Sequence, residues 1–199
     1  MNKSGLHTPD IFIDSPAEQS PLELAISQVF KNKMVKYELQ ADVTVSSATS
    51  QVDITGLSIG KDDELLLVLN IVNGTSGTSG YALYVNENNT ATNYYNQYIS
   101  ASNTSVSASL QNNGQFCTVV GISEQLLAMI NIKITDSGYV ACQSKGTSGL
   151  VTTSGVFFMD TNTISTFTVS SITQFSIVGG TNQIGAGTRF QLYRIGSAA

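Results

Sequence analysis

The sequence predicts an all-β protein, a β-sandwich or jelly roll with a short N-terminal arm and helix. Short runs of alternating apolar and polar residues recur along most of the chain, and turn-forming residues separate them. All 3 prolines lie before residue 22, so the chain changes character near residue 35. A chain of 199 residues that is 41% hydrophobic can bury the core of one such domain. We therefore expect an arm over residues 1–35 and a β-sandwich domain over residues 36–199.

The arm carries one helix signal. Ser20 can cap a helix, Pro21 suits the first helical position, and Glu23 can complete a capping box. The apolar residues that follow fall on one face, which predicts an amphipathic helix over about residues 21–33. Its apolar face is the candidate anchor of the protein and comprises Leu22, Ile26, Val29 and Phe30.

Strand signals begin after the arm. Residues 37–45 alternate apolar and polar side chains, and residues 52–54 and 57–59 continue the alternation. The nearly continuous apolar run over residues 64–72 predicts a central strand buried on both faces. Further strands are expected over residues 81–85, 94–100, 115–120, 126–134, 139–143, 150–158, 166–178 (in one or two pieces) and 188–195. Many short strands with frequent turns indicate a sandwich or a jelly roll.

The charge pattern excludes several partners. Only 12% of the residues are charged, so solubility depends on Ser, Thr, Asn and Gln, as suits a protein that works within an assembly. The net charge is −5 and no basic run exists, so we expect no nucleic acid partner. No signal peptide and no apolar run of membrane-spanning length is present, so we expect no membrane partner either.

Residues that carry chemistry are scarce. The single histidine, His7, lies in the arm, which leaves the sandwich domain without a Ser-His-Asp or Cys-His site. Cys117 and Cys142 sit in apolar strand-like runs, where two buried free thiols fit better than a disulfide. A zinc site would need more Cys or His. We therefore expect neither a cofactor nor an enzyme.

Two acidic patterns keep alternatives open. A glycosidase needs only two carboxylates, but each candidate lies near a turn with polar neighbours, where a solvated acid is the ordinary outcome. These candidates are Glu87, Glu124, Asp136 and Asp160. The cluster Asp62-Asp63-Glu64 could hold calcium, although adjacent acids where a strand starts more often form a solvated turn.

Two segments resemble virion proteins of tailed bacteriophages. Residues 91–98, Ala-Thr-Asn-Tyr-Tyr-Asn-Gln-Tyr, follow Tyr-Ala-Leu-Tyr-Val-Asn at residues 81–86 and resemble the pattern "sLYfNgdttaTNYY.Qy". Residues 184–195 resemble the ending "igaGSrF.LYri". The resemblance covers about residues 36–196. It implies location in the virion, among decoration, fibre and tail proteins.

Two roles follow from this resemblance. The first is a capsid-associated decoration, auxiliary or head-fibre subunit that is anchored by its arm. The alternative is a tail-fibre or receptor-binding module that recognises a host surface glycan. Either role implies other virion proteins, of the capsid or the tail, as partners. Low charge leaves strand edges poorly guarded, so we expect a homo-oligomer, and viral fibres suggest a trimer by analogy.

The last strand and the tyrosines supply the remaining candidate site residues. Arg189 and Arg194, the only arginines, could pair with a partner's carboxylates, although a solvated pair is the more common outcome. Tyr94, Tyr95 and Tyr98 could contact a glycan, although packing between strands is more common. In the last strand, alternation predicts Phe190 and Leu192 in the core. Gly187 should adopt a turn conformation before it.

Overall fold

The structure is a computed structural model, and it describes residues 35–197 except 76, 78, 103–104, 120–124 and 150–155. The expected anchor helix over residues 21–33 lies outside the described residues, together with Leu22, Ile26, Val29 and Phe30. Residues Tyr37–Gly196 form one compact unit, to which the following description applies.

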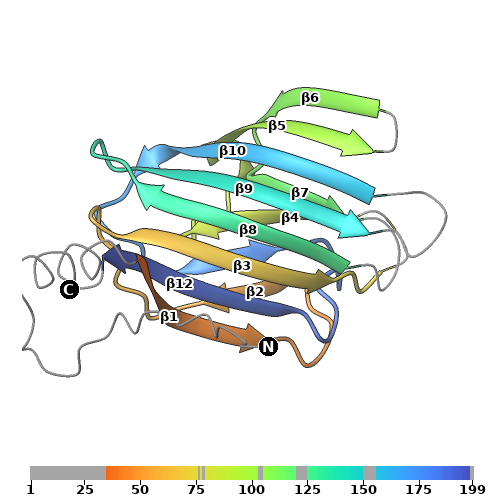
Figure 1. Ribbon diagram of the computed structural model, residues 1–199, viewed down its shortest axis with the longest axis horizontal. Coiled ribbons are helices and arrows are strands. Elements are labelled where there is room, and N and C mark those ends of the chain that lie inside the picture. Colours follow the sequence, from red (N-terminus) through yellow and green to blue (C-terminus); the bar gives the residue numbers. More distant parts are fainter. Residues whose placement is uncertain are drawn as a thin grey trace, which may run out of the picture. The chain divides into compact units, whose positions relative to one another are not determined.

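This unit is built from antiparallel strands in two sheets (Figure 1). The larger sheet has eight strands in the order β1-β12-β3-β8-β9-β10-β5-β6, and the smaller has four in the order β2-β11-β4-β7. The larger sheet comprises β1 (Val35–Thr44), β12 (Arg189–Ser197), β3 (Glu64–Val72), β8 (Gln125–Ile134), β9 (Tyr139–Gly149), β10 (Val156–Thr168), β5 (Tyr94–Ser102) and β6 (Ser105–Gln111). The smaller comprises β2 (Gln51–Ile54), β11 (Phe175–Val178), β4 (Ser79–Val85) and β7 (Gln115–Val119), and a 3-10 turn, η1 (Ala91–Asn93), precedes β5. The prediction of an all-β sandwich is confirmed.

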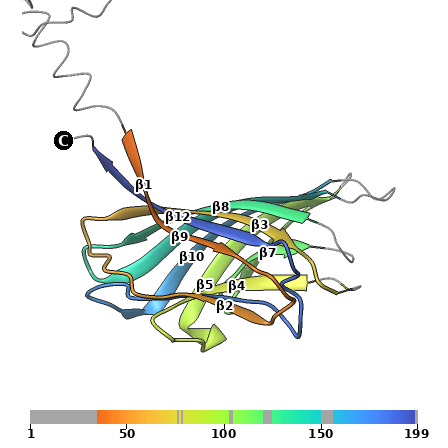
Figure 2. The ribbon, with the colours of Figure 1, turned by 90° about the horizontal axis from the view of Figure 1, so that it is seen from below.

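The two sheets pack face to face and enclose the core (Figure 2). Alternate residues of each strand point into this layer, as β8 shows with buried and exposed side chains in strict succession. Fully buried side chains come from both sheets, among them Leu67 of β3, Ile130 of β8, Phe175 of β11 and Phe190 of β12. Burial of one face therefore fixes which side chains of the larger sheet point outward.

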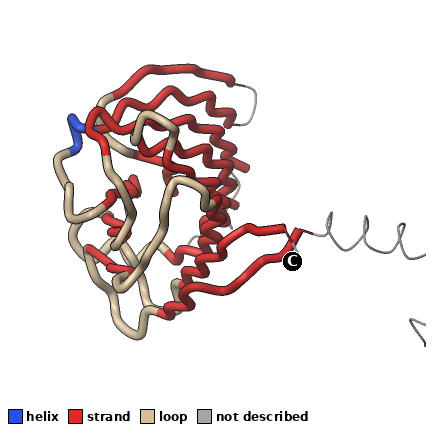
Figure 3. Tube along the Cα trace, turned by 90° about the vertical axis from the view of Figure 1, so that its left-hand side faces the viewer, coloured by secondary structure: helices blue, strands red, loops and turns tan. Residues whose placement is uncertain are grey.

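The prediction that residues 64–72 are buried on both faces is wrong for the outer face. The inward residues Leu65, Leu67 and Leu69 are fully buried, whereas Leu66 and Val68 on the other face are only half-buried. In the described part of the chain, no second layer covers the outer face of the larger sheet (Figure 3). A continuous apolar run therefore indicates a central strand, but it does not show whether one or both faces of that strand are buried.

One strand was not expected, and two are longer than expected. β6 covers residues for which no strand was predicted, although serine alternates there with Val106, Ala108 and Leu110. β9 and β10 extend through polar stretches since each has a hydrogen-bonded neighbour on both sides. No described segment forms a helix that is long and apolar enough to cross a membrane.

The turn before β12 agrees with the sequence-based prediction. Gly187 has a φ of +86°, which is in the left-handed region that favours glycine. The next residue, Thr188, is buried, and its hydroxyl accepts a hydrogen bond from the backbone N–H of Val72 at 3.0 Å. Phe190 and Leu192 are fully buried, as their alternation predicted.

We expect Phe190→Ala to lower the free energy of unfolding by about 3–5 kcal/mol, because it leaves a cavity in the central layer. This is a large share of the stability of a typical domain, about 5–15 kcal/mol. Thermal and denaturant melts measure it, with Phe190→Leu as the control that retains most of the volume. A Phe190→Ala protein as stable as the wild type would show that β12 does not close the sandwich.

Candidate functional site

A groove with a volume of about 540 Å³ lies on the outer face of the larger sheet. Side chains from six strands line it, and the central ones come from β8, β9, β10 and β5. These four strands are neighbours in the sheet: β8, β9 and β10 follow one another along the chain, and β5 comes from an earlier segment. The groove is therefore a product of strand pairing rather than of one loop or motif.

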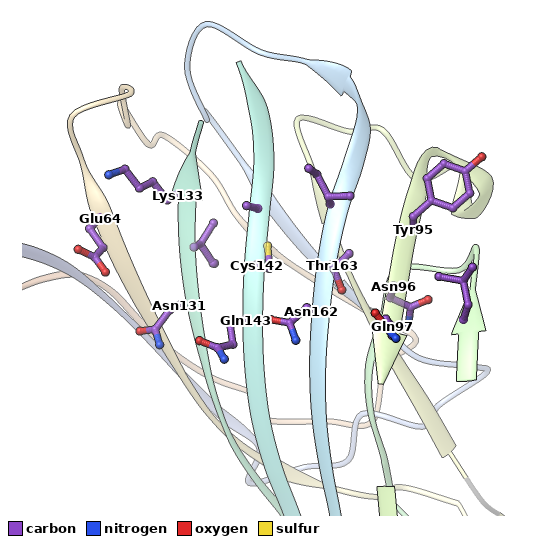
Figure 4. Close-up of a pocket in the computed structure, with 14 residues that line it drawn as sticks. Glu64, Tyr95, Asn96, Gln97, Asn131, Lys133, Cys142, Gln143, Asn162 and Thr163 are labelled. Carbon is purple, nitrogen blue, oxygen red and sulfur yellow. The ribbon is translucent and has the colours of Figure 1, made fainter. Parts of the chain in front are cut away.

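Four carboxamides cross the groove in one row. In the strand register Asn131 lies opposite Gln143, Gln143 opposite Asn162, and Asn162 opposite Gln97. We call these four residues the amide row, and Figure 4 shows them in succession across β8, β9, β10 and β5. Neighbouring strands are about 4.8 Å apart, so the row is about 14 Å long. This length suits an extended ligand better than a single small molecule.

The amide row is available to a ligand. All four residues are exposed, and no hydrogen bond to another described residue engages their side chains. Each carboxamide carries two N–H donors and one carbonyl acceptor. The row can therefore donate to and accept from a ligand at four adjacent positions.

Apolar and charged side chains flank the row at the next outward positions. Tyr95 and Ile164 lie opposite each other in the register and are 45% and 44% exposed. On the other side of the groove Lys133 of β8 lies opposite Glu64 of β3. These two are the charged residues among those that line the groove, and their charges cancel. The groove thus combines an exposed aromatic ring with neutral hydrogen-bonding groups.

The three candidate tyrosines separate onto two faces of β5. Tyr95 lines the groove, whereas Tyr94 and Tyr98 point to the opposite face because side chains alternate along a strand. Tyr94 is 3% exposed, and its hydroxyl donates to the Asn88 carbonyl at 2.9 Å and accepts from the Val85 N–H at 3.0 Å. Burial raises the pKa of this phenol. Of the three candidate tyrosines, Tyr94 and Tyr98 thus pack on the inner side of the sheet, and Tyr95 is the one that lines the groove.

Both arginines of β12 have partners within the chain. The Arg189 guanidinium pairs with the Asp42 carboxylate of β1 through two hydrogen bonds, one of them at 2.8 Å from Nε. Arg194 pairs with Asp63 at 3.2 Å and donates to the Ser58 carbonyl at 2.9 Å. Their placement supports an intramolecular role in joining β12 to its surroundings.

The acidic candidates lie apart from one another. Asp160 is on the outer face, two residues before Asn162, and its register neighbours are Lys145 and Ile99. Glu87 and Asp136 occupy turns, and Glu124 lies outside the described residues. In the Asp62-Asp63-Glu64 cluster, the Asp63 carboxylate accepts a hydrogen bond from the Gly60 N–H at 2.7 Å. Over the described ranges, no group of three His, Cys, Asp or Glu residues is placed to hold a metal ion.

Cys142 of β9 contributes to the groove lining (Figure 4), and it also packs against the core between the sheets. It is a free cysteine, as the sequence favoured. Burial raises the pKa of its thiol to about 12, so the thiolate is scarce at neutral pH. Cys117 belongs to β7, and its side chain lies outside what the structure describes.

The sequence analysis did not predict the amide row. Its four members carry no shared local motif, and each is an ordinary exposed polar residue of its own strand. Alternation along each expected strand could have marked these four residues as outward-facing. Only the strand order shows that they lie side by side.

A scan against models of known protein families finds no match for this chain, and a search of curated proteins finds none either. The function therefore has to be inferred from the residues and their geometry.

The Arg189–Asp42 pair predicts a pH dependence. Hydrogen bonds from Arg189 lower the pKa of Asp42 in the folded protein. A carboxyl whose folded pKa is depressed stabilises the fold above its unfolded pKa, about 3.9, and this contribution is lost as the pH falls through the lower, folded pKa. We expect Asp42→Asn to lower the melting temperature slightly at pH 7, with the difference disappearing in acid.

Salt provides the control for this prediction. Both partners are partly exposed, so high salt should also reduce the difference at pH 7. Arg189→Ala should behave like Asp42→Asn and cost far less stability than Phe190→Ala. A difference that persists unchanged at low pH would show that the ion pair is not its cause.

Proposed function

We propose that the protein is a non-enzymatic structural protein of a virus particle whose sandwich domain binds a neutral glycan in the amide row groove. The observation that carries the binding proposal is the amide row itself. Four exposed carboxamides in direct register, free of hydrogen bonds to other described residues, lie beside the exposed ring of Tyr95.

The chemistry of the groove favours a polyhydroxylated ligand. A sugar hydroxyl both donates and accepts hydrogen bonds, and a carboxamide offers both functions in return. The apolar face of a sugar ring can pack on Tyr95, whose ring presents an apolar body. A nucleic acid would meet a protein of net charge −5, and the one lysine in the lining lies opposite Glu64. An anionic ligand would find the same lack of positive charge.

The strand order supports a jelly-roll version of the sandwich. The set β1-β12-β3-β8 faces the set β2-β11-β4-β7, and β9, β10, β5 and β6 extend the first set. Eight strands in two such sets make a jelly roll, an architecture of viral capsid and lectin domains. The jelly-roll strand order is consistent with the proposed function, but a fold by itself does not determine function.

The virion setting rests on the sequence resemblance of residues 36–196 to phage virion proteins. Within that setting we favour a capsid-associated decoration or head-fibre subunit that is attached by residues 1–35 and presents the sandwich domain. A tail-fibre or receptor-binding module would use the same groove on a host surface glycan. The groove favours a recognition role in either position on the particle.

We expect the purified protein to bind neutral oligosaccharides on a glycan array. For a glycan that binds, Asn162→Ala should weaken affinity by about two- to tenfold in calorimetric titration, the effect of one lost hydrogen bond. Tyr95→Ala should also weaken binding, because it removes the aromatic surface.

Gln125→Ala is the matched control, since Gln125 is an exposed amide on the same face of β8 outside the groove. It should bind like the wild type. The binding proposal fails if no neutral glycan binds, or if Asn162→Ala and Gln125→Ala are indistinguishable.

Deletion of residues 1–34 should leave the sandwich domain folded but unable to join particles. The physical reason is that Tyr37–Gly196 is a compact unit by itself, so attachment can be separated from folding. Immunogold labelling of particles made with the full or the shortened chain measures attachment. Full occupancy by the shortened chain would contradict the anchor role, and loss of folding would make the arm part of the core.

A further inference from the structure

Strand β6 forms an open edge of the larger sheet (Figure 1). Among the described strands it pairs only with β5, in a register that runs without a bulge from Ser102 opposite Ser105 to Asn96 opposite Gln111. Every second residue of such an edge strand directs its backbone N–H and C=O away from the sheet. Natural edge strands are usually blocked by lysine, proline or bulges. The seven residues of β6, Ser-Val-Ser-Ala-Ser-Leu-Gln, include no lysine or proline.

The other edges differ from β6. β1 carries Lys36, Glu38 and Asp42, and β2 is only four residues long and contains Asp53. The remaining edge strand is β7, and a register shift interrupts its pairing with β4. β6 is therefore the long, regular and uncharged edge among the described strands.

The side chains of β6 are exposed in a self-complementary pattern. Val106, Ala108 and Leu110 share the outer face, opposite Ala101, Ile99 and Gln97 of β5. Val106 and Leu110 are 74% and 71% exposed, the highest values among the large hydrophobic residues that the structure describes. Ala108 lies midway between them, so the pattern of apolar residues along β6 is symmetric about Ala108.

We propose that two copies of this chain pair through β6, antiparallel, about a two-fold axis that passes beside Ala108. In this register Ala108 faces its counterpart, and Val106 of each copy faces Leu110 of the other. Directly opposed side chains on one face of an antiparallel pair interact most strongly, so the register covers the two most exposed apolar residues of each copy. A two-fold axis requires such a self-complementary patch.

The pairing joins the two larger sheets into one, with both grooves on the same face. Leu110 lies opposite Gln97 at the end of the amide row and also lines the groove, so the interface adjoins the binding site. Two grooves in one rigid sheet would bind a surface that displays many glycans more tightly than one groove does. This consequence rests on the proposed function, whereas the pairing itself does not.

Charge reversal at Ala108 tests the pairing. Sedimentation of the full chain at micromolar concentration should show a dimer. Ala108→Lys and Ala108→Glu should each be monomeric, since each places two like charges face to face. An equimolar mixture of the two variants should recover the dimer, and salt should weaken that mixed dimer. A single cooperative thermal melt of each variant establishes that it folds.

Leu127→Lys tests the alternative that two copies associate by stacking their outer sheet faces instead of pairing their β6 edges. Leu127 is 57% exposed on the same face but lies on the interior strand β8, so this variant should remain dimeric. The proposal is overturned by a monomeric or trimeric wild type, by dimers of both charged Ala108 variants, or by dissociation of Leu127→Lys alone. The charged variants should still bind a soluble glycan in titration, so a loss of pairing and a failure of glycan binding are told apart.

Discussion

The apolar layer between the two sheets is the constraint on which the rest of the structure depends. Leucines and isoleucines of β3 and β8 and the Phe190 ring of β12 are fully buried in it. A strand that slipped by one residue would turn these side chains to solvent and bring polar ones inside. Burial of the inner face therefore also fixes the outer face, and with it the positions of the amide row and the flanking Tyr95.

The candidate site uses the outer face that this layer leaves open. Strands β8, β9 and β10 are consecutive along the chain, but β5 joins them from an earlier segment and contributes Gln97 and Tyr95. The same pairing that brings β5 beside β10 leaves β6 at the edge of the sheet. The groove and the proposed self-association surface are thus two outcomes of one strand order.

Low charge gives the exposed face its character. With 12% charged residues, the outer face presents mainly amides, hydroxyls and apolar side chains, and its charged groups are few. The few charges that are present are used locally, as in the pairing of Arg189 with Asp42 and of Arg194 with Asp63. Such a surface offers little long-range electrostatic steering and depends on short-range hydrogen bonding and apolar contact for recognition.

The sequence by itself determined the fold class, most strand positions and the inward phase of β12, because period-two alternation and turn residues are local properties. It also predicted the left-handed turn at Gly187, since only glycine adopts that backbone conformation without strain. The tertiary structure decided what depends on strand neighbours. It placed Tyr95 outside and Tyr94 inside, paired both arginines within the chain, and made a strand of β6 from a serine-rich segment. The amide row could not be read from the sequence because its members become neighbours only through the register of four strands, and that register is set by burial of the opposite face.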